Sequence, residues 1–295
     1  MAEKPALHPD IAVGAALQAI ARDILSEARA ALDNRDKRNA VAVHDYRKAM
    51  KRWRALLRLL DPFLGGEGRR LRVEARDFAR ELSGARDAQS ATEALDDLAE
   101  AGPALSPRTV SSIRARLDDI RMDAEATTLT QAVRARLIVA LERTATEVDG
   151  WRLDPVTFAD LARGLAKTYR RIRKDALDDW RAADPEVLHE LRRHVVAHRY
   201  QMELVVPLWP KLARPWIAEA QRLRDRLGSF QDLSVLHGFT KPHAPLAPWR
   251  SRLVPPILEL QATHAKAAQR IGGRLLAERP KAFRRRLQAL WEQQH

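Results

Sequence analysis

Cationic side chains gather on one face of the helix expected for VAVHDYRKAMKRWRALLRLLDPF, residues 41–63. At about 100° per residue, a set of cations falls within an arc of about 100°: His44, Arg47, Lys48, Lys51 and Arg58. Arginine makes planar, bidentate contacts to phosphate oxygens, and lysine is a mobile point charge. An approaching anion also favours the protonated form of a histidine. These residue types indicate binding of a polyanion.

The opposite side of the same helix carries an apolar stripe at the spacing of a core-facing helix: Val43, Tyr46, Met50, Trp53, Leu57 and Leu60. A solvated surface is the ordinary explanation of the polar side. Such a surface usually mixes acids with bases, because pairs four residues apart stabilise a helix when their charges are opposite. Here the polar side is almost purely cationic. A binding face and a solvated face therefore both stay open for this helix alone.

The composition favours the same class of partner. The chain has 295 residues with 52 Lys and Arg against 39 Asp and Glu, a net charge of +13. Nucleic acid, an acidic membrane surface and inorganic polyphosphate are the candidate polyanions. Cysteine is absent, which excludes disulfides, thiol catalysis and thiolate zinc sites. The N-terminus lacks a basic leader pattern and no run is long enough to cross a membrane, so we expect a cytoplasmic protein.

Helix-forming residues dominate, and no alternating β-branched run predicts a strand. Proline and glycine clusters such as DPFLGGEG, AGPALSP and HGFTKPHAPLAP divide the chain. They predict an all-α fold of roughly eight or nine helices.

An internal repeat relates the two halves of the chain at an offset of 145 residues. VHDYRKAMKRWRALLRLLDPF aligns without gaps with LHELRRHVVAHRYQMELVVPL, and ELSGARDAQ then falls on RLGSFQDLS. The repeat predicts two halves, residues 1–150 and 151–295, each with about four helices. We expect two bundles related by a pseudo-twofold axis, with the two basic helices facing one another.

The repeat doubles the predicted site. The second copy supplies His189, Arg192, Arg193 and Arg199, and Arg52 lies at the edge of the first arc. The copies differ, because Val196, Ala197 and Glu203 stand where the first copy has Lys51, Arg52 and Arg58. We therefore expect more positive charge from the first half.

With these motifs the chain resembles the CHAD family, the conserved histidine α-helical domains. The resemblance rests on VHDYRKAMKRWRALLRLL with ELSGARD, and on LHELRRHVVAHRYQMEL with LRDRLGSFQDL, and extends over nearly the whole chain. It implies two four-helix bundles around a basic central cavity or pore, inorganic polyphosphate as the ligand, and association with polyphosphate granules. Some relatives carry a triphosphate tunnel domain with an ExExK signature. That signature is absent here, so the chain resembles a stand-alone CHAD protein.

Further cations could contact the same ligand. Lys167, Arg170, Arg171 and Lys174 share one side of a predicted helix, and Arg22 and Arg29 are the cations at the matching first-half positions. Lys266 and Arg270 are spaced by four residues near the C-terminus. For all of these, a solvated helix face remains the alternative.

No catalytic or metal site is expected. In HELRRH the two histidines are five residues apart, whereas the zinc protease motif needs four. His198 aligns with Trp53 on the apolar stripe, so an interior histidine is the expected role, and Asp87 and Asp232 are expected to pair with arginines. The Trp residues at 53, 209 and 216 are expected in the core or at bundle joints.

Non-enzymatic polyphosphate binding without a cofactor is therefore the leading hypothesis, with no membrane partner. A nucleic-acid-binding helical protein is the alternative from another class, although aromatic residues make up only 5%. A phosphoanhydride-processing enzyme is a third hypothesis, and it would ordinarily need a carboxylate-bound metal.

Overall fold

The expectation of an all-α protein is confirmed. The computed structural model describes residues 6–34, 38–84, 86–102, 105–176 and 179–294. Within these ranges it has ten α-helices, two short 3₁₀ turns at Val206–Leu208 and Ala247–Trp249, and no strand. The α-helices are α1 Val13–Asp33, α2 Asn39–Glu81, α3 Arg86–Ala101, α4 Pro107–Thr128, α5 Gln131–Asp149, α6 Phe158–Asp175, α7 Pro185–Glu203, α8 Pro210–Phe239, α9 Arg250–Leu275 and α10 Pro280–Glu292.

The expected helix number of eight or nine is too low for the described residues, because proline and glycine are not the only boundaries. The α4–α5 boundary has neither residue: Thr130 caps α5 by accepting a hydrogen bond from the Val133 amide at 3.2 Å. Conversely, Pro62 does not end α2, which continues past a kink at Gly65, where φ is 54°. Glycine adopts that left-handed conformation without the steric cost of a Cβ.

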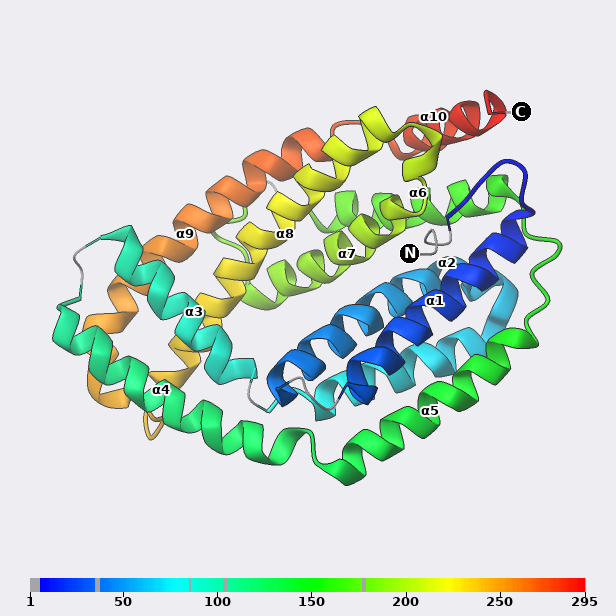
Figure 1. Cartoon of the computed structure of the whole chain (residues 1–295). Helices are drawn as coiled ribbons and strands as arrows, with labels where there is room; N and C mark the ends of the chain where they lie inside the picture. The colour runs from blue at the N-terminus through cyan, green and yellow to red at the C-terminus, as the bar shows by residue number, and fades with distance from the viewer. Residues whose placement is uncertain (1–5, 35–37, 85, 103–104, 177–178, 295) are drawn as a thin grey trace.

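The helices enclose two hydrophobic cores. The smaller core lies among α3, α4, α8 and α9, with Leu95, Ile113, Leu233 and Ile257 buried in it. The larger core lies among α1, α2, α5, α6, α7 and α10, and parts of α8 and α9 also contribute to it. Figure 1 shows α3 and α4 against α8 and α9 at the left of the view, with α10 and α6 at the upper right. Each core thus takes helices from both halves of the sequence.

The apolar stripe of α2 builds the larger core, as expected. Tyr46, Met50, Trp53 and Leu57 are buried, and Trp53 stacks on Trp151 with ring centroids 5.7 Å apart. Val43 is partly buried against the same core. Because this side of α2 is buried, the cations of α2 lie on its other side.

The α2 and α7 helices pack against each other, so the two basic segments are neighbours. The buried Gln201 side chain of α7 donates a hydrogen bond to the Ala55 carbonyl of α2 at 3.0 Å. Beyond this contact α1 packs on α2, while α6 and α8 pack on α7.

Of the three Trp residues expected in the core or at bundle joints, two belong to the larger core and the third does not. Trp53 is buried and Trp216 packs partly buried against the larger core. Trp209 is 47% exposed, because it lies between the 3₁₀ turn and α8, where the chain changes direction at the surface.

Adjacent glycines in α9 provide a matched test of packing. A Cβ on buried Gly272 would lie 2.8 Å from Cη2 of the buried Trp180 ring, whereas a Cβ on Gly273 would meet nothing within 4 Å. Overpacking of this kind costs about 1–3 kcal/mol, and alanine stabilises an exposed helical position by up to about 1 kcal/mol over glycine. We therefore expect Gly272→Ala to lower the melting temperature and Gly273→Ala to leave it unchanged or raise it. Equal effects in calorimetry would contradict the close approach of Trp180 to α9.

Candidate functional site

Cationic side chains from four helices surround the α2–α7 contact. They act on one another's charge across the interface between α2, α3, α7 and α8. We call them the central cluster, and its members are Arg47, Lys51, Arg54, Arg58, Arg86, Arg192, Arg193 and Arg224.

Lys51 lies at the middle of the central cluster. Burial, and then the positive charges of Arg86, Arg192, Arg224 and Arg47, lower its pKa from 10.5 to about 7. The neighbours thus act from three helices besides its own. A charge here is unfavourable without an anion, because neither water nor a carboxylate compensates it fully.

The arginines of the central cluster experience the same two effects. Burial is the larger cause and neighbouring cations the next, and together they lower the pKa values of Arg47, Arg58 and Arg192 to about 10. All three remain charged at neutral pH. Their positive charge is therefore confined to one place by the fold.

Several members of the central cluster have unused hydrogen-bonding capacity. Among the described residues, Lys51, Arg54, Arg58 and Arg192 make no hydrogen bond or close ion pair. The Nε atoms of Arg54 and Arg192 are buried and have no acceptor. Buried donors are normally satisfied, so these atoms are available to donate to an acceptor from outside the chain.

Arg47 is held in place by the backbone. Its Nη1 atom donates to the carbonyls of Ala79 and Leu82, the latter at 3.4 Å, where α2 ends. The helix C-terminus carries unpaired carbonyls that accept such bonds. The guanidinium is therefore oriented before any ligand binds.

Two acids near the central cluster, Asp87 and Asp232, attract its arginines without forming close ion pairs in the described contacts. The Asp232 carboxyl accepts a hydrogen bond from Ser90 and is attracted by Arg86 and Arg192, but burial outweighs both effects and raises its pKa. Asp87 similarly acts on the charge of Arg47. The expected pairing with arginines thus takes the form of attraction without a close ion pair in the described contacts.

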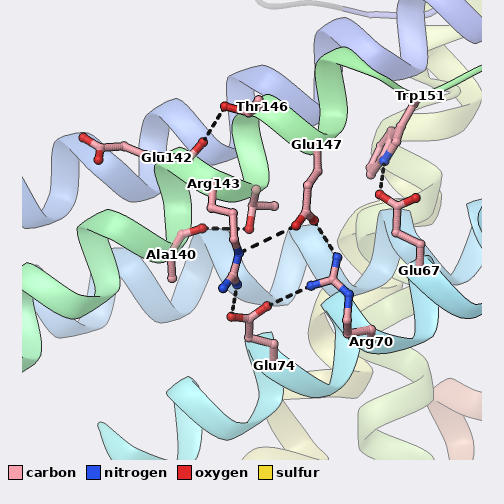
Figure 2. Close-up of polar contacts among 10 residues, drawn as sticks. Glu67, Arg70, Glu74, Ala140, Glu142, Arg143, Thr146, Glu147 and Trp151 are labelled. Carbon is pink, nitrogen blue, oxygen red and sulfur yellow. Dashed lines mark hydrogen bonds and ion pairs between the residues drawn. The ribbon is translucent and has the colours of Figure 1, made fainter.

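On the outer side of α2 the arginines do have acidic partners. Figure 2 shows Arg70 and Arg143 bridging Glu74 and Glu147, with Arg70 Nη2 at 2.7 Å from Glu147 Oε2. The Trp151 ring nitrogen donates to Glu67 at 3.0 Å. This network ties α5 to α2 and uses acids that could otherwise neutralise cations. The contrast shows that the central cluster is not simply an average portion of a basic protein.

The residues predicted from the first copy to bind a polyanion lie in different places. Arg47, Lys51 and Arg58 lie in the central cluster. His44 is exposed at the start of α2, and Lys48 faces a different space.

That space is a cavity of about 810 Å³ lined by α1, α2 and α7, which we call the neutral cavity. Its polar wall carries both signs of charge, from Lys48, Arg52, Arg199, Glu27, Asp45 and Glu203. Arg52 pairs with Glu27 and lies 3.7 Å from the Asp23 carboxylate, and Arg199 pairs with Glu203 at 3.0 Å. Two predicted ligands, Arg52 and Arg199, are therefore already compensated within the chain.

The remaining second-copy residues lie by the central cluster. Arg193 contributes to it although it also pairs with Glu190. His189 is half-buried and its Nδ1 has no hydrogen-bond partner. Burial is the largest cause that lowers its pKa, and Arg192 and Arg193 lower it further against the opposing charge of Glu186.

The other predicted cations lie apart from the central cluster. Arg22 pairs with Asp149 at 2.7 Å, and Arg29 pairs with Asp33 and Glu142, so both join α1 to nearby acids. Arg171 pairs with Asp175 at 3.2 Å. The remaining members are exposed on α6 and α9: Lys167, Arg170, Lys174, Lys266 and Arg270.

Two other histidines of α7, His194 and His198, have contacts within the fold. His198 is fully buried, accepts a hydrogen bond from the Trp216 ring at 3.1 Å, and has its pKa lowered to about 3 by burial, as expected of an interior histidine. His194 Nδ1 lies 2.9 Å from Asp175. Across the described part of the chain, no group of three or more His or acidic side chains is placed to hold a metal ion.

Sequence reasoning missed Arg54, Arg86 and Arg224 as members of the central cluster. Arg54 aligns with Arg199 at the 145-residue offset, and this match of two arginines could have identified Arg54 as a candidate. Arg86 and Arg224 belong to α3 and α8, and only the packing of those helices brings them to Lys51. Arg72 and Arg76 lie on α2 beyond its kink and act on the charges of Arg58 and Arg54, although each also pairs with an aspartate.

The fold and this site define an all-helical protein with a partly buried cationic cluster at the junction of two basic helices. The chain belongs to the CHAD family, since the CHAD domain model matches residues 15–241. The resemblance inferred from the repeated motifs is thereby confirmed. A comparison with curated proteins gives no match. Within the described residues, no helix is both long and apolar enough to span a membrane.

The charge on Lys51 should destabilise the free protein. Below pH 7 the lysine is charged in both the folded and the unfolded state, so its full cost is present. Between about pH 7 and 10.4 the folded state loses the proton first, so the cost falls as pH rises. We expect Lys51→Met to raise the melting temperature more at pH 6.5 than at pH 9.5, measured in phosphate-free buffer.

Lys48→Met is the matched control, since Lys48 is exposed one turn earlier on α2. It should change the melting temperature little at either pH. A Lys51→Met variant that is less stable than the parent at pH 6.5 would contradict the unfavourable environment of this lysine.

Proposed function

We propose that this protein binds inorganic polyphosphate through the central cluster, without catalysing its turnover, and that it associates with polyphosphate granules. The observation that carries the proposal is the confinement of Lys51, Arg54, Arg58 and Arg192 without close acidic partners among the described residues. A chain of phosphates supplies many acceptors at short spacing. It would satisfy the unused donors and offset the mutual repulsion together.

We also propose that the two halves of the sequence are copies of one unit that enclose a basic central space. A shift of 145 residues moves α1, α4 and α5 to residues 158–178, 252–273 and 276–294, which overlap α6, α9 and α10. The packing supports the same relation: α1 packs on α2 and α5, as α6 packs on α7 and α10. In this proposal residues 1–150 and 151–295 interlock, since each hydrophobic core uses both.

A thin, flexible polyanion fits the central cluster better than nucleic acid does. The cationic side chains are half-buried between helices, whereas a duplex presents its phosphates on a wide cylinder and needs an open surface or an inserted element. Aromatic rings that could stack on bases, including Trp53, Tyr169 and Trp216, are engaged in the larger core. Nucleic-acid binding therefore remains the second candidate, favoured only by the net charge.

Our proposal of binding without catalysis is supported by the role of the acids near the central cluster. Phosphoanhydride transfer ordinarily uses a carboxylate-held metal ion to stabilise the transition state. The acids near the central cluster, Asp87 and Asp232, are attracted to Arg47 and Arg192. In our proposal they orient these arginines.

Neutralising the centre of the cluster should abolish tight binding. We expect Lys51→Gln, Arg58→Gln and Arg192→Gln together to weaken long-chain polyphosphate binding by about 100-fold or more at 150 mM salt, and to reduce the slope of log affinity against log salt by about two to three. Fluorescence anisotropy measures both, and circular dichroism checks helicity.

The control triple Arg116→Gln, Arg252→Gln and Lys281→Gln removes the same charge from exposed positions on α4, α9 and α10. It should weaken binding only slightly, through the net charge. A third arm replaces Lys167, Arg170 and Lys174 of α6 by Gln. If this arm matched the loss of the central triple, the site would lie on α6 and the assignment to the central cluster would be wrong.

Selectivity separates polyphosphate from the other anions. At 150 mM salt and equal phosphate concentration, long-chain polyphosphate should displace labelled duplex DNA, and neither DNA nor ATP should displace labelled polyphosphate. The reason is that several phosphates must reach partly buried side chains at once. Displacement of polyphosphate by DNA would instead support a nucleic-acid-binding surface.

A further inference from the structure

Lys51 has a position unlike that of the other lysines assigned to the polyanion site by sequence. It is half-buried, and cationic side chains face it from its own helix and three others: Arg47 on α2, Arg86 on α3, Arg192 on α7 and Arg224 on α8. The described contacts give it no hydrogen bond and no acid within ion-pair distance.

The acidic side chains near Lys51 interact with the neighbouring arginines. Asp87 acts on Arg47, Asp225 and Asp232 act on Arg192, and Asp225 lies 2.6 Å from Arg224. On the other elements that pack against α2, the α1 acids Asp23 and Glu27 interact with Arg52 on a different side. On α6, Asp175 pairs with His194 and Arg171. Lys51 therefore lacks a built-in counter-ion.

His189 is a second group of this kind at the edge of the central cluster. Arg192 and Arg193 are the cations that act on it, and Glu186 and Glu190 act in the opposite direction. Its Nδ1 atom is buried without a partner. A protonated imidazole there needs an acceptor that the chain does not supply.

We propose that the polyanion and protons bind to the central cluster together, with Lys51 as the main proton acceptor and His189 as the second, so that the affinity for polyphosphate rises as pH falls. This inference rests on the proposed function. The protons come from solvent and buffer, and no covalent bond of the polyanion changes. Phosphate oxygens beside Lys51 supply the missing counter-charge and return the amine to its ordinary charged form.

The size of the effect follows from linkage. In the free protein the pKa of Lys51 is about 7, so the amine is mostly neutral at pH 8. If the bound polyanion restores it to above pH 9, binding at pH 8 takes up about one proton per site. The dissociation constant should then fall roughly 10- to 30-fold between pH 8.5 and 6.5. His189 adds to the uptake towards the acidic end of this range.

Calorimetry tests the inference directly. Titration of the full chain with long-chain polyphosphate at pH 8, in phosphate-free buffers of different ionisation enthalpy, gives the number of protons taken up from the dependence of the heat on the buffer. Long chains are used because only their terminal groups titrate near neutrality. We expect about one proton per site for the parent protein.

The decisive variant is Lys51→Arg, which keeps the positive charge but remains protonated throughout this pH range. It should bind polyphosphate with no proton uptake at pH 8 and a dissociation constant that changes little with pH until His189 contributes towards pH 6.5. Lys281→Arg on α10 is the matched control, exposed and outside the central cluster, and should behave as the parent protein. His189→Gln should keep the uptake at pH 8 and reduce it at pH 6.5.

The possible failures are distinguishable. If polyphosphate binds tightly with no proton uptake in the parent protein, the proton linkage is wrong and the proposed function stands. Proton uptake that persists in Lys51→Arg at pH 8 would assign the linkage to other groups, His189 first, and overturn the role of Lys51. If no polyphosphate binds at any pH to the folded parent protein, the proposed function itself fails.

Discussion

The confinement of like charge beside the α2–α7 contact is the constraint on which the site depends. Helices that packed through ordinary surfaces would bring acids to meet bases, as Arg70 and Arg143 do with Glu74 and Glu147 on the outer side. On the inner side, the charged groups of the described residues that act on Lys51 are arginines. Such an arrangement costs free energy in the absence of a ligand, so another part of the structure must offset it.

The hydrophobic cores supply that compensation. On the face of α2 opposite its cations, Tyr46, Trp53 and Leu57 are buried, and the same helix is held to α7 through Gln201 and Ala55. Burying a large apolar side chain contributes about 1.5–3 kcal/mol, and α2 buries several. Because each core takes helices from both halves of the sequence, neither basic helix can move away from the other without exposing apolar surface. The cations of the central cluster therefore stay close together, and their mutual repulsion favours the binding of an anion.

The sequence predicted what depends on periodicity and repetition. The apolar stripe of α2 and the interior place of His198 follow from spacing and from the 145-residue offset, and the CHAD family was inferred from the resemblance of the repeated motifs. It did not predict which cations meet. Lys48 and Lys51 lie on the same predicted arc, yet only Lys51 faces Arg86 and Arg224, because the position of α3 and α8 decides which edge of the arc is enclosed. Nor could spacing show that Arg52 pairs with Glu27, a contact between separate helices.

The differences between the two copies acquire a physical meaning from this geometry. Val196 and Glu203 replace Lys51 and Arg58, and Glu203 pairs with Arg199 at the neutral cavity. The matching arginine of the first copy, Arg54, has no such acidic partner among the described contacts. Glu203 thus compensates the charge of Arg199 at one part of the α2–α7 contact, whereas the charge of Arg54 is not compensated in this way. In the proposed duplication, a polyanion bound at Lys51 would therefore continue towards Arg54 and Arg58 and away from Arg199, so the differences between the copies would give the site a direction that an exact duplication could not have.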